Sequence, residues 1–510
     1  MNLLSDSWIP VRPVDGGSAA KITLQELLCS DQAWQLCLPR DDMELAALQL
    51  LISLVQVSWI PEDDASLRRF LSQPLSPSDF ETGVAQWGDM FQLDHPKYPF
   101  MQVKGVVAQK TTGLFKLMSG LSGGKNCTFV NEPGQGDFLC GGCAAIALFN
   151  QANNAPSIGG GSKWGLRGTR CPVTTLIQAV DHRRADLRTT LWLNVLTRPR
   201  LHALLGDDLR LQQKPSWQEP IKEKSRFSAA SIGLLRGLFW QPNHIELTAP
   251  IGTGQCSGCG QQMDFRYTGF LNARFKFDID GTWPHPHSPY LVQNKKGQID
   301  KQFLAFTNAA PSWTQLSRVL VKMDVDKTEN QFPAAVVSQS QDVFSTAATH
   351  LIVGGYRNKQ ATVLERRHEV MALHQGWQTH GDVIQRLVEI GLSYKDALYK
   401  ALSHFCNGGG KSSDIKGAGV EVYKKAERDF FRHSEPVVMA LLASLDFADP
   451  VPQFDQLRDS LHRVCIELFE QATEPYSHHP KLVRTMAVAR RTLHKHLSDL
   501  KPQQGDHHAA

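Results

Sequence analysis

The 510-residue sequence lacks several features that would place a protein outside the soluble globular class. No run of 18 apolar residues occurs, so we expect no membrane span. The first residues, MNLLSDSWIPVRP, contain neither a basic segment nor a long apolar one, so we expect no signal peptide and a cytoplasmic protein. Ten cysteines are too few for a disulfide scaffold. In a reducing compartment, paired cysteines favour a metal site over a disulfide.

An excess of one charge and the common catalytic motifs are also missing. The net charge is only +4, which does not by itself indicate a nucleic-acid partner. The motif HExxH does not occur, and no paired acidic motif or nucleophile with a base predicts an active site. NGGGKSS resembles part of a phosphate-binding loop, but Phe405 stands where its first glycine is needed. His285 and His287 in WPHPHSPY favour a structural turn over a metal site.

The hydrophobic pattern divides the chain, whose length predicts two or more domains. Residues 1–370 mix helices, such as 41–59, with strand-like stretches, such as HLIVGG at 350–355, and with loops rich in glycine and proline. A helical pattern begins near Ala361, and residues 371–510 contain four amphipathic segments, which predict an antiparallel bundle. The expected fold class is α+β, with a large mixed N-terminal domain that has long loops and a zinc staple, followed by a C-terminal antiparallel four-helix bundle.

Two CxxC pairs provide the strongest chemical signal, Cys140 with Cys143 and Cys256 with Cys259. Each pair encloses glycine, which allows the backbone to bring both sulfurs to one point. Together they supply the four soft ligands of a tetrahedral structural zinc site. The ion would join distant segments, because 112 residues separate Cys143 from Cys256. Four buried thiols without a metal remain an alternative, and a redox role is less favoured because neither pair lies in a strand–helix context.

Two glycine-rich stretches predict loops that approach a ligand. FVNEPGQGDFLCGGC, residues 129–143, suits neither helix nor strand, and its thiols tie down its C-terminal end, as expected for a recognition loop. SIGGGSKWGLRGTR, residues 157–170, allows close backbone approach, and Lys163, Arg167 and Arg170 predict contact with phosphate or a DNA groove. An ordinary surface turn and a flexible linker are the respective alternatives.

Several longer blocks resemble one family. They are NLL-D-WIPVRP, LPRDDMELAAL, FVN-PGQG---CGGC-AIALFNQAN, RGLFWQP-HIEL, RYTGFL, WPHPHSP and GGYRN-QA--LERRH. From Met1 to about Pro502 the chain resembles the large subunit of the type I-E CRISPR surveillance complex (Cascade), the CasA family. The resemblance implies a non-catalytic subunit that recognises the protospacer-adjacent motif (PAM) of double-stranded DNA through the minor groove, wedges the duplex open for R-loop formation and helps recruit the helicase-nuclease.

The same resemblance implies the partners. They are the double-stranded target DNA, the guide RNA-containing complex with its backbone, handle-binding and small subunits, and the CRISPR helicase-nuclease, with no membrane. Two other readings remain open. A zinc-stabilised stand-alone nuclease or hydrolase would need acidic or histidine-based residues that activate a metal in a cleft. A pure scaffold subunit would leave the recognition loops without a purpose.

The resemblance also assigns residues to DNA recognition. Those matching the two PAM-facing loops are Phe129, Val130 and Asn131, and Gly159, Gly160 and Gly161. Arg274 takes the place of a lysine that enters the minor groove, and as a planar fork it can alter which motif bases are tolerated. Ser157 stands where the family pattern has glycine.

Two further sets concern the opened duplex. Lys359, Gln360 and Ala361 match the wedge, although the position of Lys359 is commonly asparagine, and a helix is expected to follow near Ala361. Lys295 and Lys296 match a pair that holds the displaced strand, consistent with an electrostatic contact to its backbone.

Overall fold

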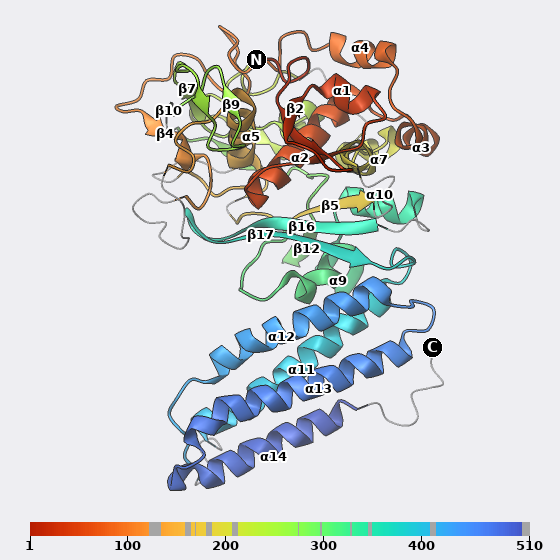
Figure 1. Ribbon diagram of the computed structural model, residues 1–510, viewed down its shortest axis with the longest axis vertical. Coiled ribbons are helices and arrows are strands. Elements are labelled where there is room, and N and C mark those ends of the chain that lie inside the picture. Colours follow the sequence, from red (N-terminus) through yellow and green to blue (C-terminus); the bar gives the residue numbers. More distant parts are fainter. Residues whose placement is uncertain are drawn as a thin grey trace. The chain divides into compact units, whose positions relative to one another are not determined.

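The computed structural model describes most of the chain. The described residues are 1–121, 134–158, 165–168, 170–179, 186–206, 213–273, 275–295, 298–326, 329–344, 349–408 and 415–501. They contain 14 α-helices and several small β-sheets, a mixed α+β composition (Figure 1). No helix in these ranges is long and apolar enough to cross a membrane.

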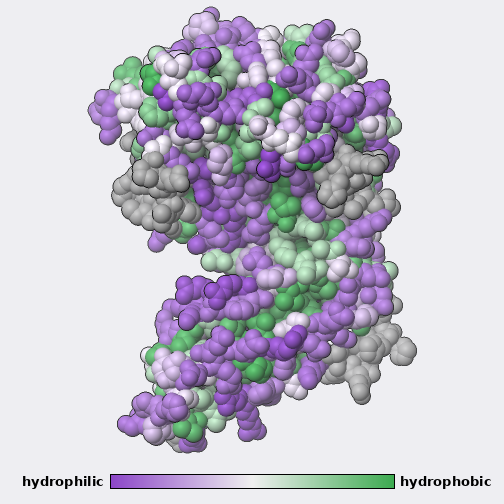
Figure 2. Space-filling model, viewed as in Figure 1, coloured by the Kyte–Doolittle hydropathy of each residue, from purple (hydrophilic) through white to green (hydrophobic). Residues whose placement is uncertain are grey.

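The chain forms two compact units. The larger unit comprises Met1–Thr307, Lys322–Phe344 and Ala348–Val370, and the smaller unit comprises Asn308–Val321, Ser345–Ala347 and Met371–Ala510. On the face drawn in Figure 2, hydrophilic residues predominate on each unit, and smaller hydrophobic areas are scattered among them.

Helix α2, Asp41–Ser58, runs through the core of the larger unit, and the prediction of a helix at 41–59 is confirmed. All but two of its residues are buried, because it packs against α5, α6 and α8 as well as strands β3 and β16. The carboxylates of Asp41 and Asp42 accept hydrogen bonds from backbone N–H groups of the first turn, at 2.9 and 3.0 Å, and so satisfy donors that a helix start leaves free.

The other helices of the larger unit are short. They are α1 Leu24–Cys29, α3 Asp64–Ser72, α4 Pro77–Ala85, α5 Gly141–Asn153, α6 Leu187–Leu193, α7 Arg198–Leu205, α8 Leu234–Leu238 and α10 Ala335–Val343. Helix α1 begins with a capping box between Thr23 and Glu26.

The strands form small, mostly antiparallel sheets. The sheet orders are β2-β1-β3, β4-β10-β7, β11-β6, β13-β12-β15-β14, β17-β16-β5 and β8-β9. The strands up to β9 are β1 Ile9–Pro13, β2 Ala20–Ile22, β3 Trp34–Leu36, β4 Thr112–Gly113, β5 Thr174–Ala179, β6 Arg226–Ser228, β7 His244–Leu247, β8 Gly254–Gln255 and β9 Gln262–Met263. The remaining strands are β10 Gly269–Ala273, β11 Asp278–Asp280, β12 Tyr290–Lys295, β13 Gln298–Phe303, β14 Met323–Asp326, β15 Glu329–Phe332, β16 Thr349–Lys359 and β17 Thr362–Leu373.

The expectation of a helix beginning near Ala361 is wrong. Thr362–Leu373 is strand β17, which pairs with β16 across a two-residue turn, and β16 pairs with β5 from Thr349↔Ala179 to Gly354↔Thr174. The apolar residues after Ala361 fit a half-buried strand as well as a helix, and the non-local partner β16 decides between the two. The stretch HLIVGG lies in β16, as predicted.

The long helices of the smaller unit are α11 Gly381–Asn407, α12 Tyr423–Ser444, α13 Val451–Thr473 and α14 Val483–Asp499, with the short α9 Leu316–Leu320. Helix α11 packs against α12, α13 and α14 as well as α9, and α12 packs against α13. The residues that α11 buries recur at helical spacing, as the sequence predicts. They include Ile384, Leu387, Val388, Leu398, Leu402 and Phe405.

Candidate metal centre and nucleic-acid interface

Helix α5, Gly141–Asn153, begins inside the first glycine-rich stretch, residues 129–143, and ends before the second, residues 157–170. The prediction that the first stretch is not helical is therefore wrong for Gly141–Cys143. Residues 129–131 precede its N-terminus and residues 159–161 follow its C-terminus; both sets lie outside the described residues. Every residue of the helix except Asn153 is buried. At about 1.5 Å per residue its length is roughly 20 Å, so one rigid, buried element sets the distance between the anchored ends of the two stretches.

Four cysteine sulfurs meet at the N-terminus of α5, which confirms the predicted convergence of the CxxC pairs. The Sγ atoms of Cys140, Cys143, Cys256 and Cys259 all lie within 4.8 Å of one another, and those of Cys140 and Cys259 are 3.9 Å apart. In a tetrahedral zinc site with bonds of about 2.3 Å, sulfurs are separated by about 3.8 Å. The donor set and its spacing therefore fit zinc without rearrangement of the backbone.

Backbone geometry explains why these thiols converge. Cys140 is the N-cap of α5, and its sulfur accepts a hydrogen bond from the N–H of Cys143 at 3.4 Å. The sulfur of Cys256 accepts from the N–H groups of Cys140 and Gly258, at 3.2 and 3.3 Å. A Cβ atom at Gly258 would lie 2.9 Å from the Cys143 sulfur. Glycine inside this pair is thus required by close packing, as the sequence suggests.

A cation lies beside the thiols. The ammonium of Lys21, on strand β2, is 2.9 Å from the Cys140 sulfur. Burial is the largest single influence on the pKa of Lys21 and lowers it, but the charges of Cys140, Cys259 and Cys143 and the hydrogen bond to Cys140 together raise the pKa above its ordinary value, so the side chain remains charged. Four thiolates around one divalent ion carry two net negative charges, and Lys21 offsets part of that charge.

The segment that contains Cys256 and Cys259 also holds the residues that lead into α5. Phe138 and Ser257 exchange backbone and hydroxyl hydrogen bonds of 2.7 to 3.0 Å, and Leu139 and Tyr267 exchange two backbone hydrogen bonds of 3.0 and 2.8 Å. The end of the stretch that contains residues 129–131 is therefore fixed to the β8–β9 region.

The prediction that Arg167 contacts phosphate is wrong, because its side chain is buried. Its guanidinium donates to the carbonyl of Asn153 at 3.1 and 2.6 Å and to the side chain of Asn154. It also donates to the hydroxyls of Thr174 and Ser288, at 3.2 and 2.7 Å. These acceptors are all neutral, and burial lowers the pKa of Arg167 to about 9. The guanidinium ties the chain after residues 159–161 to the C-terminus of α5, where a cation is favourable.

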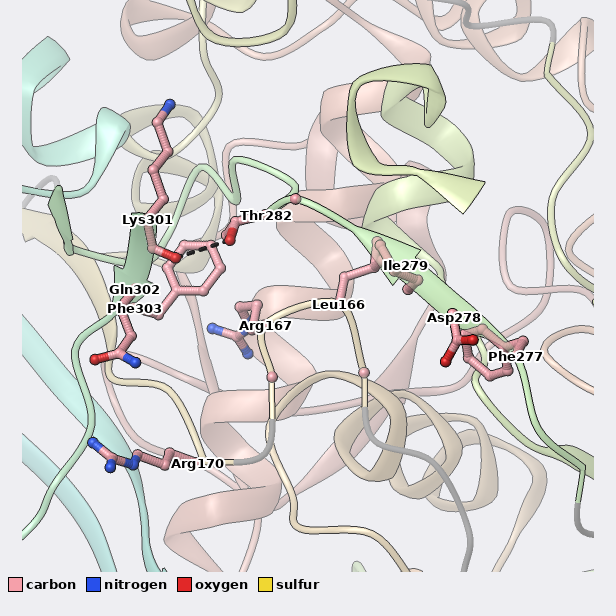
Figure 3. A pocket seen from close by; sticks show the side chains of 13 residues that line it. Leu166, Arg167, Arg170, Phe277, Asp278, Ile279, Thr282, Lys301, Gln302 and Phe303 are labelled. Atoms are coloured by element: carbon pink, nitrogen blue, oxygen red, sulfur yellow. Dashed lines mark hydrogen bonds between the residues drawn. The ribbon is translucent and has the colours of Figure 1, made fainter. Parts of the chain in front are cut away.

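A cavity of about 400 Å³ lies beside this segment (Figure 3). Its lining residues include Gly165, Leu166, Arg170, Phe277, Lys301 and Phe303. The hydroxyl of Thr282 donates to the carbonyl of Lys301 at 2.9 Å and joins two of the lining segments. Arg170 and Lys301 are exposed at the cavity, so Arg170 remains available for the predicted phosphate contact.

The β16–β17 hairpin presents Gln360 at its tip. The two residues of the turn are Gln360 and Ala361, and the side chains of Lys359 and Gln360 are exposed. Gln360 has a φ of 53°, the conformation that glycine normally supplies at the first position of such a turn. Asn358 donates to the Gln360 carbonyl at 2.7 Å and accepts from the N–H of Cys171 at 3.3 Å. The tip is thereby tied to the segment that leads from residue 170 into strand β5.

Comparison with known proteins decides the family. The family model of CRISPR-associated protein Cse1 matches residues 2–468. The chain belongs to the Cse1 family. This confirms the resemblance drawn from the sequence blocks, because the solved Thermus thermophilus structure is described as CasA (Cse1).

Solved Cse1 structures share the fold. The chain is 17% identical to Thermobifida fusca Cse1, with a TM-score of 0.72, over 98% of this chain and 99% of that chain. It is 18% identical to Thermus thermophilus CasA (Cse1), with a TM-score of 0.69, over 97% and 99%. A chain of a solved CRISPR RNA-guided surveillance complex is 15% identical, with a TM-score of 0.66, over 97% and 99%.

Several predicted site residues of this Cse1 chain lie outside the described residues. They are Phe129, Val130, Asn131, Gly159, Gly160, Gly161, Arg274 and Lys296. Lys295 ends strand β12. The DNA-binding roles of these nine residues therefore remain predictions.

Sequence reasoning missed Asn358 and the buried role of Arg167. Asn358 lies in the GGYRN block, but its link to Cys171 joins residues 187 apart. No local pattern signals such a contact.

Proposed function

We propose that this chain is the DNA-recognition subunit of an RNA-guided CRISPR complex of the Cascade type. It reads the PAM of double-stranded DNA through the minor groove and opens the duplex beside it. The observation that carries the proposal is the common anchorage of three segments. The stretch with residues 129–131 enters α5 at the cysteine cluster. The stretch with residues 159–161 follows α5 and is held at its end by Arg167. Asn358 ties the Gln360 hairpin to Cys171, in the segment before β5.

The hairpin has properties suited to a wedge. Separating stacked bases costs on the order of a few kcal/mol per step, so the inserted group must be held firmly. The exposed Gln360 amide projects from a two-residue turn whose carbonyl is tied down by Asn358. An amide can hydrogen-bond the bases that it separates. Lys359 and Ala361 flank it and complete the wedge.

Cations complete the DNA-binding surface. Arg274 enters the minor groove, and Lys295 with Lys296 holds the backbone of the displaced strand. Arg170 and Lys301, at the cavity beside the glycine-rich stretch, add positive charge there. A net charge of only +4 supports local patches over a uniformly basic surface.

The cysteine cluster holds a structural zinc ion, and the chain is not an enzyme. A bound zinc ion would cross-link two segments far apart in sequence. Four protein ligands fill a tetrahedral site and leave no position for a reactive water. Among the described residues, these cysteines are the only group of metal-binding side chains that converges. This weighs against the alternative of a stand-alone nuclease or hydrolase, which would need an open site.

Membership of the Cse1 family supports the domain roles and the further partners that we propose. The functional division is an N-terminal PAM-recognition domain of residues 1–370 and a C-terminal antiparallel four-helix bundle of residues 371–510. Partners are the guide RNA with the backbone, handle-binding and small subunits, and the helicase-nuclease that the complex recruits in the cytoplasm. The support is the structural likeness to a chain of a solved CRISPR RNA-guided surveillance complex.

A motif-library binding assay tests the function. The complex is reconstituted with and without this chain, and each form selects from duplexes that share one protospacer and carry a randomised flanking motif. We expect enrichment of a short motif only when the chain is present. Equal selection by both forms would refute the proposal. A complex carrying Tyr394→Phe, a buried change in α11, serves as the matched control.

A further inference from the structure

A buried line of hydrogen bonds crosses the larger unit beneath the hairpin. Arg40 donates two hydrogen bonds to Asp42, at 3.0 and 2.7 Å. The hydroxyl of Tyr356 donates to the Asp42 carboxylate at 2.8 Å and accepts from the amide of Asn150 at 2.7 Å. All four side chains are at most 5% exposed, so water cannot replace a partner that moves away.

The line reaches three segments, which lead to the two PAM-facing loops and to the hairpin tip. Arg40 also donates to the carbonyl of Ser119 at 2.8 Å, three residues before residue 122 in the connection that leads to Phe129. Asn150 lies in the last turn of α5, the end from which the glycine-rich stretch leaves. Tyr356 belongs to β16, four residues before Gln360, which places it roughly 13 Å from the tip.

The second strand of the hairpin meets the same carboxylate. The guanidinium of Arg366, in β17, lies 3.7 Å from Asp41 and 3.9 Å from Asp42. Helix α2 also packs directly on β16, because a Cβ atom at Gly354 would lie 2.5 Å from the Leu45 side chain. Both strands of the hairpin therefore contact the N-terminal turns of α2.

The chemistry of the line favours a fixed geometry. Burial, together with the Asp42 carboxylate, raises the pKa of Tyr356 well above its ordinary value. The phenol therefore keeps its proton and can donate to Asp42 while it accepts from Asn150. The hydrogen bond from Tyr356 to the Asp42 carboxylate holds the hairpin on α2 and is stronger than a neutral one. The bond from Asn150 to Tyr356 is neutral but buried, so a shift of α5 relative to the hairpin would leave its polar groups without a partner, which is costly.

We propose that Asn150, Tyr356, Asp42 and Arg40 form a positioning relay that holds the Gln360 tip in register with the PAM-reading segments. When these segments bind a motif, the base pair next to the motif therefore lies at the Gln360 tip. The inference rests on the proposed function and adds to it a set of residues that touch no DNA and act through the hairpin.

The test is Tyr356→Phe in the full complex, with Tyr267→Phe as its matched control. Tyr267 is also buried in the larger unit. It pairs with Leu139 through its backbone alone, and its hydroxyl has no hydrogen-bond partner among the described residues. We expect Tyr356→Phe to bind motif-bearing duplexes within two-fold of the unchanged complex. It should form R-loops on linear DNA at least five-fold more slowly and recover on DNA with a preformed bubble. Tyr267→Phe should match the unchanged complex on all substrates.

A second variant guards against a folding defect. Asn150→Leu breaks the same line from the α5 side, so it should show the same substrate pattern, and the double variant should be no slower than the slower single variant. Additive slowing in the double variant would overturn the relay. So would either single variant that is slowed equally on linear and bubble DNA, or that opens linear DNA at an unchanged rate. Gln360→Ala is measured in parallel. If this variant opens linear DNA at the normal rate, the proposed wedge function of Gln360 is refuted. If Gln360→Ala is slow but Tyr356→Phe is normal, only the positioning relay is refuted.

Discussion

Replacing Gln360 with glycine should make the protein more stable and worse at opening DNA. The backbone at Gln360 has a φ of 53°, a left-handed conformation that costs a residue with a side chain about 1–2 kcal/mol. Glycine removes this strain but adds about 0.5–1 kcal/mol of chain entropy to the unfolded state. The difference between the two ranges is about 0–1.5 kcal/mol, and their midpoints give an expected net gain in unfolding free energy of about 0.75 kcal/mol. Alanine keeps the strain, so Gln360→Ala should be less stable than Gln360→Gly.

The loss of function has a different origin from the gain in stability. Both variants keep the Asn358 hydrogen bond, because it is accepted by the backbone carbonyl of residue 360. Both lose the amide that we propose enters the base stack. A hydrogen bond is worth about 1 kcal/mol net, which corresponds to roughly a five-fold slower opening step. Gln360→Asn, which tolerates a positive φ and keeps a shorter amide, should fall between the unchanged protein and the glycine variant.

The assay compares R-loop formation rates on linear, negatively supercoiled and bubble DNA that share one motif, alongside denaturant unfolding of each chain. The defect should be largest on linear DNA and smallest on the bubble, because the duplex is then already open. A glycine variant that opens linear DNA at the normal rate would refute the wedge. A glycine variant less stable than the alanine variant would refute the strain argument. Equal slowing on all three substrates would show that Gln360 reads or positions DNA without opening it.

Three further predictions concern the metal, the cations and acid stability. Cys256→Ser should release about one zinc ion per chain and lower the unfolding free energy by up to about 4–5 kcal/mol, the closure term for a loop of about 100 residues; full retention of zinc by elemental analysis would contradict the site. Arg274→Ala should weaken binding to motif-bearing duplexes more than to motif-less ones. Lys295→Ala with Lys296→Ala should weaken both alike and reduce the salt dependence, and identical behaviour of the two variants would remove this distinction. Burial lowers the pKa of His287 to about 3, while an unfolded histidine titrates near 6.5, so the unfolding free energy should fall as pH drops from about 6.5 to 3; His287→Gln should flatten that slope, and an unchanged slope would contradict it.

The sequence by itself determined the features that depend on local pattern or on unusual residues. Helix α2 and helix α11 both follow from apolar residues at helical spacing. Helix α11 buries one face, as that spacing predicts, whereas α2 is buried on nearly all sides by the elements packed around it. The cysteine cluster follows from two CxxC pairs whose glycines permit sharp turns, since soft ligands in a reduced protein have few other uses. The long sequence blocks were enough to indicate the family.

Only the tertiary structure decided which side chains are buried and which segments meet. Nothing in the sequence around Arg167 distinguishes it from an exposed cation, yet it donates five hydrogen bonds to neutral acceptors, three of them at the end of α5. The segment after Ala361 became a strand because β16 offered it a partner. Tyr356 donates to Asp42, 314 residues away. Such contacts depend on packing between distant segments, and no local periodicity or spacing encodes them.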